Sequence, residues 1–243
     1  MKKEFWRDWK SPTQLEKQAI KSLKVGKRII LQNIPREKIQ SIYVKGTFVM
    51  REMNSKSDVD LSIIVKESKL MDKINKLNKK FKEKHKPQIG FTGYSIQELK
   101  KGKISRYGKQ IRTGPRRALK QFHHYKLIYG EPLDLTKFDS GKDVKQLETM
   151  IKVFNELFLP SYRKGKFGFA QIVKQVFWLT ENELRAKNIK HGYSYRKIAK
   201  AVKDKNHIIH EALKIRLKPT KDKAIRKQFI AKLKKHLREL EIK

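Results

Sequence analysis

The first half of the chain alternates between short runs of β-branched and aromatic residues and longer stretches in which apolar residues recur every three or four positions. The short runs end at glycine, proline or polar turn residues, which is typical of β-strands. The longer stretches have the period of helices with one buried face. We therefore expect strands at 41–48, 59–65, 88–96 and 127–133, and helices that begin near residues 11 and 70. Gly26 is expected to interrupt the first helix.

The second half of the chain carries helical periodicity alone. Its apolar stripes are separated by Pro160, by Pro219 and by short polar stretches. Several amphipathic helices in sequence predict a helical bundle. The chain between the last expected strand and residue 141 is rich in turn residues, so we place a boundary there. The prediction is an α+β domain over residues 1–140, followed by a basic helical domain over residues 141–243.

Two aspartates stand at the start of the second expected strand. Asp58 and Asp60 are two residues apart, so in a strand their side chains project from the same face. Neighbouring carboxylates repel each other unless a cation lies between them, and Mg²⁺ takes such oxygen ligands together with phosphate and water. Gly46 and Thr47 close the preceding strand, where a glycine lets a phosphate approach the backbone and a hydroxyl can bind it. The alternative is a surface hairpin whose aspartates cap a turn.

Gly46-Thr47, a spacer and Ser57-Asp58-Val59-Asp60-Leu61 together resemble the signature of the nucleotidyltransferase superfamily, in particular its small polymerase-β-like archaeal and bacterial members. The resemblance implies a mixed sheet backed by helices. It implies that Asp58 and Asp60 are the catalytic residues and bind Mg²⁺ or Mn²⁺, while Gly46 and Thr47 bind the triphosphate of an NTP, for which ATP is favoured. An NMP would then be transferred to a hydroxyl acceptor. The following helices resemble, in position and size only, the helical domain of kanamycin-nucleotidyltransferase-like proteins.

The third expected strand departs from the family pattern. The family places a third carboxylate there, where it helps to hold the catalytic metal and activates the attacking hydroxyl. Residues 88–96 contain no Asp or Glu, and the nearest acid is Glu98. Whether the protein is an enzyme therefore stays open. The alternative is a catalytically degenerate nucleotidyltransferase-like protein that acts as a structured-RNA or ribosome-binding factor. A weaker third option is the modification of a protein partner, as in small toxin-neutralising nucleotidyltransferases.

Charge points to a polyanionic partner. The chain has 61 Lys and Arg against 24 Asp and Glu, a net charge of +37, and nucleic acid is the polyanion that best relieves such self-repulsion. A highly charged solvated surface is the alternative, although such surfaces usually balance lysine with glutamate. The acid-free segment from Leu99 to Tyr129 is the expected RNA-contacting surface, while its aromatic residues are expected to lie in the core. Its predicted RNA-binding residues are Lys103, Arg106, Lys109, Arg112, Arg116, Arg117 and Lys120.

The absence of cysteine excludes disulfides and thiolate metal sites. No apolar run approaches the length of a membrane span, and the N-terminal residues lack the apolar segment of a secretory signal. We therefore expect a cytoplasmic protein that binds nucleotide and RNA or the ribosome, not membranes.

Overall fold

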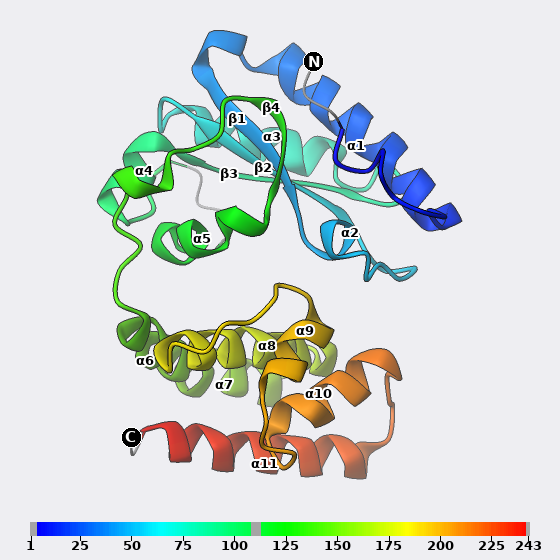
Figure 1. The fold of residues 1–243 in the computed structure, drawn as a ribbon, viewed down its shortest axis with the longest axis vertical. Coiled ribbons are helices and arrows are strands. Elements are labelled where there is room, and N and C mark those ends of the chain that lie inside the picture. The colour runs from blue at the N-terminus through cyan, green and yellow to red at the C-terminus, as the bar shows by residue number, and fades with distance from the viewer. Residues whose placement is uncertain (1–3, 108–112, 242–243) are drawn as a thin grey trace. The chain divides into compact units, whose positions relative to one another are not determined.

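The computed structural model describes residues 4–107 and 113–241. The chain divides into two compact units, Met1–Ser140 and Gly141–Lys243, each with its own set of elements (Figure 1). The first unit contains all the strands of the described residues, and the second is helical. The predicted α+β class, a mixed sheet with helices followed by a helical region, is confirmed.

The first unit is built on a four-stranded sheet with the order β3-β2-β1-β4. Strand β1 is antiparallel to both β2 and β4, whereas β2 is parallel to β3, so the sheet is mixed. All four strands lie where the hydrophobic pattern predicted them, with ends that differ by up to three residues. The strands are β1 (Ile39–Lys45), β2 (Val59–Val65), β3 (Ile89–Ser95) and β4 (Lys126–Gly130).

Helices α1 (Gln14–Asn33) and α3 (Leu70–Phe81) cover one face of this sheet (Figure 1). The prediction that Gly26 interrupts α1 is wrong, because the helix runs through it. A Cβ at Gly26 would lie 2.5 Å from Cδ1 of Leu61, so the glycine lets the helix lie close to β2. On the opposite side of β1, Tyr43 packs edge-on against Phe122, with the ring centroids 5.2 Å apart.

Two predicted boundaries need correction, the start of the first helix and the end of the first strand. Helix α1 begins at Gln14 instead of near residue 11, and its cap is Thr13. The Thr13 hydroxyl accepts the Glu16 amide hydrogen at 3.2 Å, and the Glu16 carboxylate accepts the Thr13 amide hydrogen at 2.7 Å. The first strand ends at Lys45 instead of Phe48. Gly46 adopts a φ of +82°, which a strand cannot continue through, and helix α2 (Thr47–Met50) follows. The remaining helices of this unit are α4 (Ile96–Lys101) and α5 (Pro115–Gln121), with 3₁₀ turns at Arg36–Lys38, Phe122–His124 and Leu135–Lys137.

The second unit is a bundle around one apolar core. Helix α8 packs against α6 and α10, and the large side chains Phe154, Phe177 and Phe229 are fully buried. The helices are α6 (Asp143–Val153), α7 (Leu159–Arg163), α8 (Phe169–Ala186), α9 (Tyr195–Ala201), α10 (Ile208–Leu217) and α11 (Lys223–Glu241), with a π-helical segment at Phe154–Phe158. Within the described residues, every helix is too short or too polar to cross a membrane.

Candidate functional site

The carboxylate of Asp60 lies in a slot between two glycines. Asp60 is paired with Lys45 of β1 on one side and with Gly90 of β3 on the other. A Cβ at Gly46 would lie 3.3 Å from Oδ2 of Asp60, and a Cβ at Gly90 would lie 2.7 Å from Oδ1. We call this arrangement of Asp60 between Gly46 and Gly90 the glycine-walled slot. Because neither wall carries a side chain, the Asp60 carboxylate can lie close to the backbone on both sides.

The other predicted site residues lie at the same end of β2. Asp58 precedes the strand by one residue and is half-buried, like Asp60. Thr47 is the first residue of α2 and follows Gly46 directly. Helix α2 is anchored by Phe48, which is fully buried in the core. The fold thus brings Gly46 next to Asp60.

The structure does not bring a third carboxylate to this slot from Glu98. Residue Ser95, at the far end of β3, pairs with the last residue of β2, whereas Gly90 pairs with Asp60. These two ends of β3 are about 17 Å apart at the rise of a strand. Glu98 instead closes the capping box of α4 with Ser95 and accepts hydrogen bonds from the amide and hydroxyl of Ser105 at 2.8 and 2.7 Å. Its role is structural.

An ion pair that the sequence did not suggest holds the loop after α2. Arg51 has a φ of +58° and donates from Nε and Nη2 to the two carboxylate oxygens of Glu16, at 2.8 and 3.1 Å. Its guanidinium also lies over the ring of Trp9, 5.0 Å from the centroid, and that ring packs on Phe48. The hydrogen bond from Arg51 lowers the pKa of Glu16, against the opposing effect of burial. Arg51 therefore fastens α2, next to the slot, to the start of α1.

Replacing Glu16 with glutamine should lower the free energy of unfolding by about 1.5 kcal/mol near neutral pH, because a charged hydrogen bond to Arg51 is lost. Glutamine still completes the capping box, so the change isolates the ion pair. Since the pKa of Glu16 is lowered by folding, its contribution is present above its ordinary value of 4.5 and disappears as the pH falls through the lowered pKa. Urea unfolding at pH 7 and at pH 4 should show the variant and wild type converging in acid. A constant difference would contradict the assignment.

Of the seven predicted RNA-binding residues, the described residues include Lys103, Arg106, Arg116, Arg117 and Lys120, whereas Lys109 and Arg112 lie outside them. Several of these side chains already have partners in the protein. The guanidinium of Arg106 lies 5.1 Å from the ring centroid of Tyr107, and Arg116 pairs with Asp139 at 3.1 Å. The Nε atom of Arg117 is buried. The prediction that Phe122 belongs to the core is confirmed, since the residue is 3% exposed.

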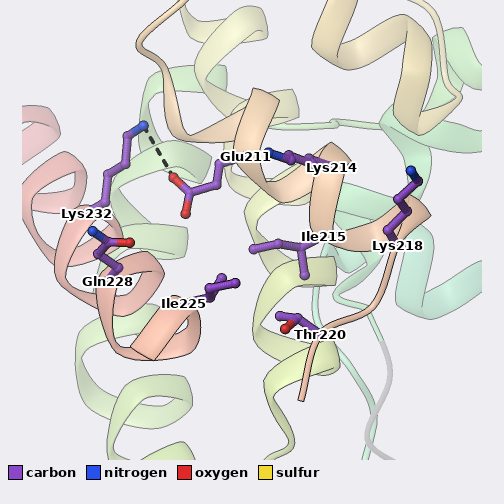
Figure 2. A pocket seen from close by; sticks show the side chains of 8 residues that line it. All are labelled: Glu211, Lys214, Ile215, Lys218, Thr220, Ile225, Gln228 and Lys232. Carbon is purple, nitrogen blue, oxygen red and sulfur yellow. Dashed lines mark ion pairs between the residues drawn. The ribbon is translucent and has the colours of Figure 1, made fainter. Parts of the chain in front are cut away.

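The second unit has a basic pocket between α10 and α11 (Figure 2). The pocket has a volume of about 610 Å³, and an ion pair between Lys232 and Glu211, at 3.4 Å, spans it from one helix to the other. Lys214 of α10 and Lys218, the residue that follows α10, line it and are exposed, while Ile225 lines it from α11. The pocket combines cationic side chains with an apolar floor.

A buried polar cluster in the second unit was also missed by the sequence reasoning. Glu183, His207 and His236 come from α8, the start of α10 and α11, and are far apart in the sequence. The available signal was that Glu183 continues the apolar stripe of α8 and His236 continues that of α11, at positions where a charged residue is unexpected.

Comparisons with known proteins bear on the fold. No protein-family model matches the chain, and no curated protein does. Among solved structures, the chain is similar to a spectinomycin adenyltransferase, AAD(9), from Enterococcus faecialis, determined with ATP and spectinomycin. The match has a TM-score of 0.52 and 14% sequence identity, and it covers 88% of this chain and 99% of that one. At this identity the likeness speaks for the fold. The chain therefore has the nucleotidyltransferase fold that the Gly46–Asp60 segment led us to expect.

Proposed function

We propose that the protein transfers a nucleoside monophosphate from an NTP to a hydroxyl acceptor. The observation that carries this proposal is the glycine-walled slot, in which the Asp60 carboxylate lies next to the backbone of Gly46. The similar adenyltransferase was determined with ATP, which favours ATP as the donor. The alternative of a degenerate nucleotidyltransferase-like protein differs from this proposal in one measurable respect, namely turnover.

The residues at the slot would have two functions, binding of a metal ion and binding of phosphate. Asp58 and Asp60 would hold Mg²⁺ or Mn²⁺, since two carboxylates at an open strand end match the oxygen ligands that these ions take. The ion would neutralise triphosphate charge. Gly46 leaves room for a phosphate at the backbone, and the Thr47 hydroxyl can donate a hydrogen bond to it. Positioning and charge stabilisation account for most of the catalysis in such transfers.

In this reaction the acceptor oxygen forms a bond to the α-phosphorus, and the bond from that phosphorus to the pyrophosphate oxygen breaks. The hydroxyl proton is released to water, and pyrophosphate leaves. Gly90, which pairs with Asp60, supplies no carboxylate to deprotonate the acceptor. We therefore expect slow turnover that rises with pH.

The direct test incubates the purified full chain with each α-labelled NTP, Mg²⁺ and total cellular RNA, followed by gel separation and pyrophosphate detection. Label in RNA, or on the protein itself, together with pyrophosphate release supports the transferase. If the protein binds ATP without releasing pyrophosphate under any acceptor condition, it belongs with the degenerate, binding-only alternative.

For the acceptor or partner we propose RNA, on the strength of charge. The second unit alone contains 27 Lys and Arg against 10 Asp and Glu. Exposed lysines border its pocket between α10 and α11, whereas Arg106 and Arg116 of the first unit contact Tyr107 and Asp139. Lysines of this kind neutralise phosphates irrespective of base sequence. A ribosomal surface is one place where such a chain could meet structured RNA.

RNA affinity should fall about a thousandfold between 50 and 200 mM salt if on the order of six phosphates are contacted. Replacing Lys214 and Lys218 with glutamine should flatten the slope of log affinity against log salt by about two, because two phosphate contacts are lost. The matched control replaces Lys76 and Lys79 of α3 with glutamine. These two lysines are also exposed, so the control removes the same charge from another place. Equal slopes for both double variants would show that net charge alone, without a defined surface, governs the binding.

A further inference from the structure

The buried cluster of the second unit converges on a single carboxylate oxygen. Oε2 of Glu183 lies 3.0 Å from Nε2 of His207 and 3.3 Å from Nε2 of His236. The three side chains are 7, 7 and 11% exposed. The other oxygen, Oε1, accepts a hydrogen bond from Lys187 at 2.7 Å. Burial opposes ionisation of Glu183, but its contacts with His207, His236 and Lys187 outweigh it and hold its pKa far below the usual range.

The imidazole of His236 lacks a well-formed hydrogen bond at one of its nitrogen atoms. The Nε2 atom of His236 is buried and has no hydrogen bond of acceptable geometry, although it lies near Glu183. Buried polar atoms of this kind are uncommon and call for an explanation, such as an ion. The ring centroids of His207 and His236 are 4.4 Å apart, so both rings meet at the same point. Two imidazoles and one carboxylate are a typical donor set for a transition metal.

We propose that Glu183 Oε2, His207 Nε2 and His236 Nε2 bind one late first-row divalent ion, of which Zn²⁺ is the preferred example. Ligands at about 2.0–2.1 Å from a tetrahedral zinc ion are about 3.3 Å from one another, close to the 3.0 and 3.3 Å found here. All ligand atoms lie within 4.8 Å of one another. Imidazole ligands select against Mg²⁺, so this site is distinct from the nucleotide site in its ion as well as in its place.

The surroundings set the character of the site. A pocket of about 890 Å³ opens beside the cluster and leaves a fourth coordination position accessible to water or to an exogenous ligand. Lys203, Lys232 and Lys235 line that pocket together with Asp204 and Glu239. Lys232 and Lys235 form ion pairs with Glu211 and Glu239, so the lining does not by itself select the charge of a fourth ligand. The same lysines oppose a free dication, as does Lys187, although Lys187 also fixes the orientation of the carboxylate through Oε1.

Metal binding has an identifiable local cost. Nδ1 of His207 accepts the amide hydrogen of Ile209 at 3.1 Å, which caps the start of α10 and leaves the ring proton on Nε2. Coordination through Nε2 moves that proton to Nδ1 and gives up the cap. In exchange, the ion joins α8, α10 and α11 at one point. The site should therefore bind more weakly than a closed four-ligand zinc site and stabilise the bundle when occupied.

The test uses untagged full-length protein, dialysed against a chelator and then titrated with ZnCl₂ by calorimetry and with CoCl₂ by visible absorption. We expect one equivalent of Zn²⁺ to bind, a rise in the thermal unfolding midpoint, and the intense visible bands of four-coordinate Co²⁺. His236→Gln should weaken Zn²⁺ binding by more than about tenfold. The matched control is His191→Gln, a histidine of the same unit outside the cluster, which should bind zinc like the wild type.

The zinc titration and the cobalt spectrum of the wild type test the proposal even if a variant fails to fold. Three results would overturn the proposal: no zinc binding by the wild type, a wild-type cobalt complex with only the weak bands of six-coordinate Co²⁺, or zinc binding by His236→Gln that equals that of the wild type. Glu183 would then be the centre of an ion-pair network with Lys187 and the two histidines, and nothing more. Because the ATP-dependent assay reports on the other unit, failure of this proposal leaves the proposed transferase function untouched.

Discussion

Asp60→Asn is expected to lower NMP transfer by at least about a hundredfold while leaving the unfolding midpoint nearly unchanged. Asparagine keeps the side-chain volume in the glycine-walled slot but removes the charge that holds the ion. Asp60 is half-buried at a strand end, so the sheet loses no apolar contact. The measurement is pyrophosphate release at saturating ATP and Mg²⁺, beside a urea unfolding curve.

The control for Asp60→Asn is Glu83→Gln, which removes one negative charge from an exposed position after α3. It should transfer NMP like the wild type. If Asp60→Asn turns over at the wild-type rate with normal Mg²⁺ dependence, the Asp pair is not the metal site. The proposed chemistry would then have to be abandoned, whereas the fold would be unaffected.

Gly90→Ala should also abolish most of the transfer, although position 90 carries no chemistry of its own. The added Cβ would lie 2.7 Å from Oδ1 of Asp60, a separation that real Cβ atoms do not tolerate. Because the clash is with the end of a side chain, the Asp60 carboxylate can rotate away and the fold survives. A displacement of this size at a catalytic group costs on the order of a hundredfold in rate.

Gly114→Ala is the matched control, since a Cβ at Gly114 meets nothing within 4 Å and its φ is −60°. Both variants add one methyl group in place of a glycine hydrogen. Only Gly90→Ala should raise the Mg²⁺ concentration needed for half-maximal transfer. Wild-type activity in Gly90→Ala would show that the carboxylate works in another orientation, and the slot would lose its proposed role.

The hydrophobic pattern predicts the order of strands and helices. It does not predict two local features, which depend on the backbone conformation or close packing of individual glycines. The period-two and period-3.6 segments predicted the strands and helices because burial on one face dictates both patterns. The end of β1 was misplaced because the backbone conformation of Gly46, not the apolar run through Phe48, terminates the strand. The expectation that Gly26 interrupts α1 is wrong because this glycine serves close packing against Leu61, which the sequence of the helix alone does not reveal.

The candidate site was predictable in part. Gly46 and Asp60 stand at the adjoining ends of two consecutive antiparallel strands, so their meeting follows from local spacing. The part played by Gly90 could not be foreseen, because it depends on the parallel register of β3 against β2. The Glu183 cluster draws on three helices, and no spacing rule links residues so far apart.

The glycine-walled slot also limits how this protein can evolve. A carboxylate introduced at position 90 would need the space that Asp60 occupies, so the missing third acid cannot be regained there by one substitution. Gln88 offers a shorter route: it is exposed, its carbonyl accepts the amide hydrogen of Val59 at 2.8 Å, and a single base change converts it to glutamate. That step would place a new acid directly before β3, at the end of the sheet where β2 begins, without altering Gly46 or Gly90.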